Sequence, residues 1–278
     1  MQMPSITRRE TCLLTLFALL ATAAIAGPSV PAAGLAGSPF AYIPPSGGSA
    51  RLVDMLSSLP MAAVGVWGLR WLQWLDRAHE QAQDAAARPQ SVMPPPATPF
   101  DCAWMFFAGL IVTAAGSVFY HLQPDALRLA ADRAGMAVAC AGLVGFAVCE
   151  RVSARAGWPA AWFTLGAGLL AAIACQRGNA LPWALVQAGG IGLMAALALA
   201  RPAIGAIGAR FGWATAAFAL AKIFELSDRA IVEASHGLFS GYALKHLTAA
   251  FAALLVLNGL QAMGRRTLRH NSGVALTA

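Results

Sequence analysis

The sequence predicts an all-α fold: a polytopic transmembrane bundle of seven core helices preceded by an N-terminal apolar segment. Hydrophobic residues make up 58% of the 278-residue chain and charged residues only 11%, and the mean hydropathy is +0.62. Soluble domains carry about 25% charged residues. The apolar runs are also long, and a run of about 20 apolar residues spans a bilayer as a helix.

The predicted elements are the apolar runs between charged residues and Gly or Pro breaks. The first run, 11–27, follows Arg8 and Arg9 and ends in small residues, so it fits either a retained span or a signal peptide that is removed. Arg210 interrupts one of the later runs. The seven runs expected to form the core helices are 54–75, 101–121, 131–149, 157–175, 181–200, 207–224 and 240–263.

These runs divide the chain into four parts. Residues 1–27 are the N-terminal apolar segment, and residues 28–50, rich in Pro, Gly and Ser, form an outer linker. The seven-helix transmembrane domain covers 51–265, and 266–278 is a basic inside tail. Within the domain, the polar stretch 76–99 is expected to continue its helix at first and then to become a Pro-rich loop.

The arginines orient the chain across the membrane, because loops on the inner side carry an excess of Lys and Arg. With both termini inside, the outer segments hold only four arginines: Arg51, Arg128, Arg177 and Arg229. The inner segments hold many more: Arg8, Arg9, Arg70, Arg77, Arg88, Arg151, Arg155, Arg201, Arg210, Arg265, Arg266 and Arg269. This topology explains most of the formal net charge of +7 without a nucleic-acid partner.

Polar side chains gather at the outer ends of the predicted helices. Ser117 and His121 are four residues apart and share a helix face, and Asp132 begins the next span. Tyr242 and His246 lie in the first turns of the last span. The orientation came from arginines alone, yet it places all five residues at a similar depth, so we expect one shared site. Ionisable side chains at membrane depth are costly and usually functional.

These residues carry a resemblance to a known family. The motifs are Gly-Ser-x-x-Tyr-His-x-x-Pro at 116–124, Asp-Arg at 132–133 and Ser-Gly-x-x-Leu-Lys-His-Leu at 240–247. Together they resemble the bacterial branch of the alkaline ceramidase family, within the CREST superfamily of seven-helix membrane hydrolases. That family has a serine and a histidine on the second core helix, an aspartate on the third and His-x-x-x-His on the seventh. The stretch 56–60 also resembles the family's first-helix signature, without its asparagines.

The resemblance implies a zinc-dependent integral-membrane hydrolase acting on linear amide bonds. Its substrate would be a ceramide-like lipid from the bilayer, cleaved to a sphingoid base and a fatty acid. Zn²⁺ would be the cofactor, with His121 and His246 as ligands. Asp132 would orient the zinc-bound water or carry its proton, and Ser117 would hydrogen-bond a ligand, the aspartate or the developing oxyanion.

The same resemblance implies a cellular setting and a set of partners. We expect a multi-pass protein of a bacterial inner membrane, with the site on the periplasmic side and the C-terminus inside. A ceramide-like lipid and the membrane are the expected partners, with no nucleic acid and no protein partner. A transporter is a further possibility, but a transporter carries polar residues through the middle of the membrane, whereas these spans are polar mainly at their outer ends.

One position departs from the family pattern, because Tyr242 stands where the first histidine of His-x-x-x-His is expected. Hydrolytic zinc needs about three protein ligands and one open position for water. Three alternatives remain open. His236 in the outer loop is the third ligand, or an oxygen of Tyr242, Asp132 or Glu225 replaces it. Otherwise zinc binds weakly or not at all, and the protein is a non-catalytic seven-helix relative that binds lipid or acts structurally.

A charged cluster lies at the outer end of the run 207–224. It consists of Lys222, Glu225, Asp228 and Arg229. Helical spacings of three and four predict the ion pairs Lys222–Glu225 and Glu225–Arg229. A structural ion-pair network is favoured here over contact with substrate.

Overall fold

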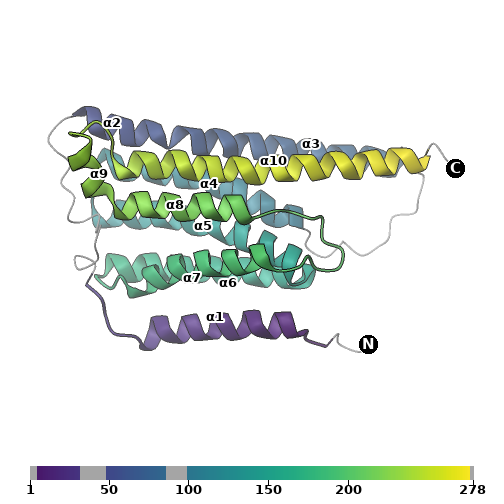
Figure 1. The fold of residues 1–278 in the computed structure, drawn as a ribbon, viewed down its shortest axis with the longest axis horizontal. Coiled ribbons are helices and arrows are strands. Elements are labelled where there is room, and N and C mark those ends of the chain that lie inside the picture. The colour runs from purple at the N-terminus through teal and green to yellow at the C-terminus, as the bar shows by residue number, and fades with distance from the viewer. Residues whose placement is uncertain (1–4, 32–47, 86–98, 276–278) are drawn as a thin grey trace.

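The computed structural model describes residues 5–31, 48–85 and 99–275. Within those ranges the chain is helical, apart from connections and an isolated bridge between Pro31 and Asn179 (Figure 1). The helices are α1 (Arg8–Ala26), α2 (Gly48–Ser57), α3 (Leu59–Ala85), α4 (Pro99–Leu122), α5 (Ala126–Arg151), α6 (Ala154–Gln176), α7 (Leu181–Leu199), α8 (Gly212–Leu226), α9 (Asp228–Ala234) and α10 (Gly241–Ala275). The predicted all-α fold is confirmed.

Seven stretches of this described chain are long and apolar enough to cross a membrane. They are Arg8–Ala26, Leu52–Ala78, Pro99–Leu122, Ala126–Arg151, Ala154–Gln176, Leu181–Leu199 and Gly241–Ala262. The polytopic membrane bundle is therefore confirmed. Its long helices run side by side, with α2 and α9 at one end of the bundle and the N-terminus of α1 at the other (Figure 1).

The first core span consists of two helices. The apolar stretch Leu52–Ala78 covers parts of both α2 and α3, which are separated at Ser58. Pro60 explains the break, because it has no backbone N–H to donate within a continuous helix and is tolerated in the first turn of a new one, where it lies in α3. The break lies close to the residues of α2 that face the last helix. As predicted, α3 continues into the polar stretch as far as Ala85, and residues 86–98 lie outside the described chain.

The predicted span 207–224 differs from the observed helix, because α8 begins only at Gly212 and has 15 residues. Residues 200–211 are irregular, with Gly205 and Gly208 in the left-handed region of the backbone. The fully buried carboxylate of Glu150 stabilises this segment by accepting the N–H groups of Ile207, Gly208 and Ala209 at 2.8–2.9 Å. Irregular backbone at membrane depth needs such internal partners.

Small residues bring α4 and α5 into close contact. A Cβ atom added at Gly142 on α5 would lie 2.2 Å from the backbone N of Phe106 on α4. At the other end of the pair, a Cβ atom on Gly116 would lie 2.9 Å from Cα of Asp132. Such close approach is typical of membrane helix pairs. It places Ser117, the neighbour of Gly116, beside the helix that carries Asp132.

Polar and aromatic contacts join helix α1 to the rest of the bundle. Glu10 accepts hydrogen bonds from Ser153 at 2.6 Å and from Arg155 at 2.6 and 2.7 Å. The ring of Phe17 stacks on Phe163, with centroids 4.5 Å apart. Within the predicted N-terminal apolar segment 1–27, residues Arg8–Ala26 therefore form a helix that packs on the bundle. Of the predicted linker 28–50, residues 32–47 lie outside the described chain, and α2 begins at Gly48.

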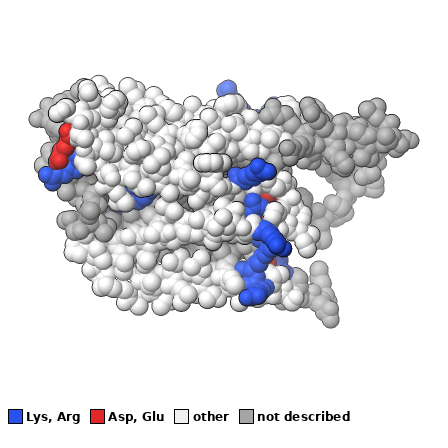
Figure 2. Space-filling model, viewed as in Figure 1, with Lys and Arg blue, Asp and Glu red and all other residues white. Residues whose placement is uncertain are grey.

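Arginines gather at the end of the bundle that holds the N-terminus of α1. Arg9 donates to the carbonyl oxygens of Arg151 and Arg201, at 2.8 and 3.1 Å, so three predicted inner segments meet there. In Figure 2 most of the blue atoms lie toward this end, and a broad white surface separates them from the opposite end. The predicted basic tail begins as helix, because α10 continues to Ala275.

Candidate functional site

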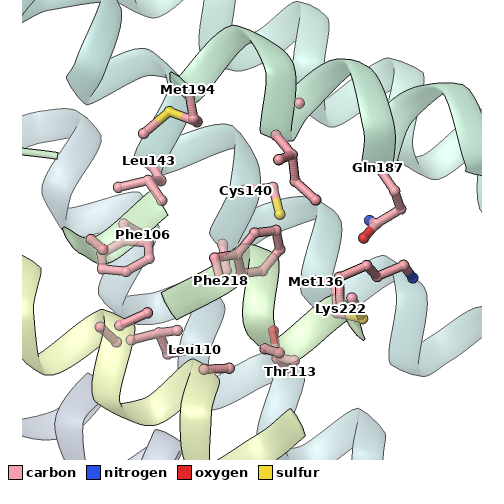
Figure 3. Close-up of a pocket in the computed structure, with 18 of the residues that line it drawn as sticks. Phe106, Leu110, Thr113, Met136, Cys140, Leu143, Gln187, Met194, Phe218 and Lys222 are labelled. Carbon is pink, nitrogen blue, oxygen red and sulfur yellow. The ribbon is translucent and has the colours of Figure 1, made fainter. Parts of the chain in front are cut away.

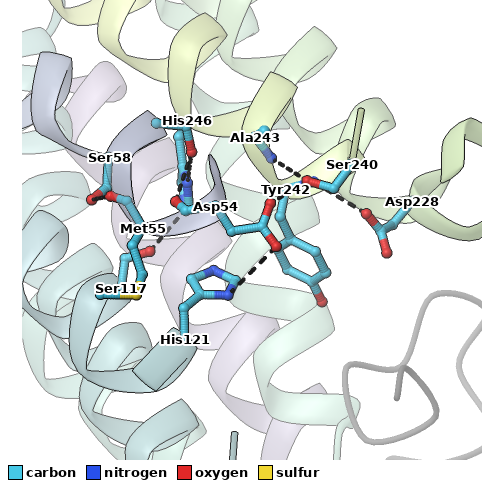
Figure 4. A network of polar contacts seen from close by, with 11 residues as sticks. Asp54, Met55, Ser58, Ser117, His121, Asp228, Ser240, Tyr242, Ala243 and His246 are labelled. Carbon is cyan, nitrogen blue, oxygen red and sulfur yellow. Dashed lines mark hydrogen bonds and ion pairs between the residues drawn. The ribbon is translucent and has the colours of Figure 1, made fainter. Parts of the chain in front are cut away.

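The imidazole of His246 is held between two serine hydroxyls. Its Nδ1 lies 2.9 Å from Oγ of Ser57 on α2, and its Nε2 lies 3.0 Å from Oγ of Ser117 on α4. His246 itself comes from the first turns of α10 and is only 2% exposed. Three helices therefore converge on one ring (Figure 4). The start of α10 lies with α2 and α9 at the end of the bundle opposite the N-terminus of α1 (Figure 1).

The hydrogen bonds determine which nitrogen of His246 carries the proton. Ser57 donates its hydroxyl proton to the carbonyl oxygen of Asp54 at 2.7 Å, so its oxygen must accept from Nδ1–H. Nε2 then has the free lone pair, and Ser117 donates to it, because a neutral imidazole has one donor and one acceptor nitrogen. This tautomer gives His246 a basic nitrogen that faces Ser117.

Asp54 on α2 joins His246 to the rest of the site. One carboxylate oxygen accepts the hydroxyl proton of Ser240, and the other lies 3.8 Å from Nδ1 of His121 (Figure 4). Ser240 in turn accepts the backbone N–H of Ala243 at 2.9 Å and so caps α10. Asp54 and Ser57 were not among the predicted site residues. A carboxylate in an apolar span was the signal that could have identified Asp54, and Ser57 lies in the stretch 56–60 that resembles the family's first-helix signature.

His121 and Tyr242 form an aromatic corner beside His246. The His121 ring meets the rings of Tyr242 and His246 edge-on, with centroids 5.6 and 5.7 Å apart. The backbone N–H of Tyr242 donates to Asp228 at 3.2 Å. Burial raises the pKa of the Asp228 carboxyl above its ordinary value, although this N–H opposes the shift. The structure therefore brings Ser117, His121, Tyr242 and His246 together, as predicted.

Asp132 and His246 line one pocket. Lys222, Glu225 and Lys245 line the same part of it. Glu225 pairs with Lys222 at 2.8 Å, as predicted, and with Lys245 at 3.6 Å.

Arg229 does not form the predicted ion pair with Glu225. Arg229 instead pairs with Glu233 at 2.8 Å within α9. The helix is interrupted at Ser227, between α8 and α9, so residues 225 and 229 do not have the geometry of one continuous helix.

The pocket extends from these charged groups into the apolar middle of the bundle. Its volume is about 110 Å³. Figure 3 shows its walls, which are mostly hydrocarbon, aromatic ring and sulfur. The labelled apolar lining residues are Phe106, Leu110, Met136, Cys140, Leu143, Met194 and Phe218. The charged groups and His246 therefore form a polar head on an apolar pocket, which suits a molecule with an alkyl chain and a polar group.

The residues present do not fit a three-ligand zinc site in this arrangement. In the described ranges, no three His, Cys, Asp or Glu side chains are grouped so that they could hold a metal ion. Tyr242 occupies the position of the missing histidine, and both nitrogens of His246 already face serine hydroxyls. This arrangement supplies no third ligand beside His121 and His246 from the described residues, and zinc binding by these two histidines stays a prediction.

His236, the predicted tentative third ligand, lies apart from these contacts. It is exposed in the turn after α9 and has a positive φ of 50°. Within the described chain its side chain makes no hydrogen bond, ion pair or ring contact with the predicted site residues. A ligand role for His236 therefore requires a rearrangement of this turn.

Comparison with known proteins adds no family to this description. No family model, no curated protein and no solved structure matches the chain. The resemblance to alkaline ceramidases therefore rests on the residues quoted for it, and the function has to be argued from the site.

Proposed function

We propose that this protein is an integral-membrane hydrolase that cleaves the amide bond of a ceramide-like lipid. The observation that carries the proposal is the contact between Ser117 and the basic Nε2 of His246, 3.0 Å apart, beside the polar head of an apolar pocket. A hydroxyl bound to an imidazole lone pair is the arrangement that activates serine as a nucleophile. The lipid's alkyl chain would occupy the apolar part of the pocket.

The proposed reaction uses Ser117 and His246 in turn. The Ser117 oxygen attacks the amide carbonyl carbon while its proton moves to Nε2 of His246. The imidazolium then gives that proton to the leaving amine as the C–N bond breaks, which releases the sphingoid base and leaves an acyl ester on Ser117. Water, deprotonated by His246, hydrolyses the ester and releases the fatty acid.

Neighbouring groups have supporting roles in this proposal. Ser57 is a positioning residue, because it accepts the Nδ1–H of His246 and so keeps Nε2 unprotonated. Lys222 and Lys245 line the pocket head and favour the negative charge that develops on the carbonyl oxygen. Asp132 lines the same head and would stabilise the imidazolium that forms during attack.

A second candidate is a non-catalytic lipid-binding or structural membrane protein. Tyr242 in place of the family's histidine favours it, as does the lack of a grouped set of metal ligands in the described chain. In this case the apolar pocket would still bind an alkyl chain, and the serine–histidine contacts would hold the helices together.

The cellular location is part of the proposal. The arginine-rich end would face the cytoplasm of a bacterium and the site would lie near the periplasmic surface of the inner membrane. The substrate would then reach the pocket from the bilayer rather than from water.

The deciding experiment incubates detergent-purified protein with N-palmitoylsphingosine and measures palmitate and sphingosine by mass spectrometry. Hydrolysis that is lost in Ser117→Ala and retained in Ser235→Ala, a serine of the loop after α9, is the expected result. An added mass of one acyl group on the peptide containing Ser117 would identify the ester. Zinc content is measured on the same samples.

Three outcomes separate the alternatives. Hydrolysis with about one zinc per chain, lost on chelation, would replace the serine mechanism with the predicted zinc mechanism. Lipid binding without hydrolysis would favour the non-catalytic candidate. Neither binding nor hydrolysis would contradict both proposals.

A further inference from the structure

The side-chain amide of Gln187 is an unsatisfied polar group in the wall of the pocket. Gln187 is 6% exposed, and its Oε1 is buried without a hydrogen-bond donor from the described part of the chain. It enters the pocket from α7, near the side chain of Lys222 on α8 (Figure 3). Buried polar atoms in folded proteins nearly always have a partner, so this exception calls for one that is not part of the chain.

The surroundings of Gln187 make a purely structural role a poor explanation. Its neighbours along the pocket wall of α7 are apolar or small: Val186, Gly190, Ile191 and Met194. A leucine at position 187 would fill similar space without a desolvated carbonyl oxygen, so the glutamine lowers the stability of the empty pocket. That cost is offset when a bound molecule donates a hydrogen bond to Oε1.

The shape of the pocket indicates what kind of molecule this is. Its wall on α5 runs from Asp132 to Val144, which is about 18 Å along a helix. One end carries Asp132, Lys222 and Lys245, and the other end is apolar. A narrow apolar pocket of this length within a membrane bundle suits an alkyl chain. Gln187 lies six residues from the start of α7, in the part of the pocket that adjoins the polar head.

We propose that Gln187 selects lipids that carry a hydrogen-bond donor, a hydroxyl or an amide N–H, beside the alkyl chain. Oε1 accepts that donor while the chain occupies the apolar part of the pocket. Fatty esters and other lipids without a donor at this position leave Oε1 unsatisfied and bind more weakly. This inference rests on the lipid-binding part of the proposed function and does not require hydrolysis.

The test compares two lipids of the same chain length on the full-length protein in detergent. The first probe is N-palmitoylsphingosine, and the second is the same lipid with its amide nitrogen and both hydroxyls methylated, so that it has no donor. Dissociation constants are obtained by displacement of a fluorescent alkyl-chain probe. The wild type is expected to prefer the first lipid by about tenfold.

Two variants assign the preference to Gln187. Gln187→Leu should bind both lipids with nearly equal affinity, and Gln187→Met should do the same. Met194→Leu changes the apolar wall of the same pocket while conserving volume, and it should change both affinities by a similar factor. If the Leu and Met variants keep the wild-type preference, or if the wild type has none, the inference is wrong.

The thermal midpoint of the lipid-free protein gives an independent readout. Gln187→Leu should leave it unchanged or raise it, because the variant removes a desolvated oxygen. A lower thermal midpoint in both the Leu and Met variants would mean that Gln187 stabilises the fold, and it would contradict a role of Gln187 in ligand selection. If the protein does not hydrolyse the lipid, the dissociation constants and the thermal midpoint can still be measured. The inference about Gln187 and the proposed hydrolase activity are therefore tested separately.

Discussion

Ser57 and His246 lie 189 residues apart in the sequence, yet Oγ of Ser57 is 2.9 Å from Nδ1 of His246. Because Ser57 already donates its proton to the Asp54 carbonyl oxygen, it accepts the imidazole proton. A serine that was not among the predicted site residues thereby determines which nitrogen of the predicted histidine is basic. This relationship leads directly to the first prediction.

Ser57→Ala should lower kcat about 10–100-fold and change KM little, because the His246 ring loses the acceptor that sets its tautomer and orientation. The tautomer itself can be read from the ¹⁵N chemical shifts of His246, which should show mixed protonation in the variant. Ser58→Ala is the matched control, because Ser58 is also buried but donates to the Met55 carbonyl oxygen instead. A single unchanged tautomer in Ser57→Ala would contradict the assignment.

Tyr242→His should raise zinc content toward one ion per chain if the site is a weakened zinc site. The new imidazole would lie beside His121, whose ring is 5.6 Å from that of Tyr242, and would complete a three-histidine set with His246. Metal analysis after zinc supplementation and desalting measures the change. Combining Tyr242→His with His121→Ala should abolish the gain. Equal zinc in wild type and Tyr242→His would show that the site is not a zinc site lacking one ligand.

Glu10→Ala should lower the free energy of unfolding by about 1–3 kcal/mol, because it removes the carboxylate that accepts hydrogen bonds from Ser153 and Arg155. Thermal or denaturant unfolding in detergent measures the loss. Glu233→Ala removes an ion pair whose side chains are 64–89% exposed and should have almost no effect. Equal stability of both variants would mean that α1 is not docked by Glu10.

The docking of α1 also bears on whether residues 1–27 are removed. Intact mass spectrometry of the protein purified from membranes should include this segment, because its contacts with Arg155 and Phe163 of α6 and with α7 bury part of the helix. A mass that lacks residues 1–27 would support the signal-peptide alternative instead.

Gly142→Ala should destabilise the protein by about 1–3 kcal/mol, because the new methyl group would lie 2.2 Å from the backbone N of Phe106 and force α4 and α5 apart. Loss of activity should accompany it, since the same helix pair carries Ser117 and Asp132. Gly192→Ala on α7 is the control, because a Cβ atom there meets open space. That variant should be neutral or stabilising by up to about 1 kcal/mol.

Much of the fold could be predicted from the sequence, because membrane helices are marked by long apolar runs. The extent of α8 could not. Residues 207–211 are apolar enough to look helical, but Glu150, from a distant helix, binds the N–H groups of Ile207, Gly208 and Ala209 instead. The break between α2 and α3 was likewise hidden within one continuous apolar run.

The candidate site was partly predictable for a similar reason. Ser117 and His121 share a face through helical spacing, and the count of spans placed Tyr242 and His246 at the same depth. Asp54 and Ser57 on α2 and Gln187 on α7 were not predicted as site residues, because spacing within one helix does not show which groups its side chains meet on other helices.

The sequence by itself determined that this is a multi-span helical membrane protein with histidines and a serine near one end, because hydropathy and helical periodicity are local properties of a chain. Only the tertiary structure decided which groups touch: that Ser57 and Ser117 hold opposite nitrogens of His246, and that Gln187 has an unsatisfied oxygen in the wall of the pocket. Those contacts depend on how helices far apart in the sequence rotate and pack, and the close-packed bundle as a whole sets that rotation.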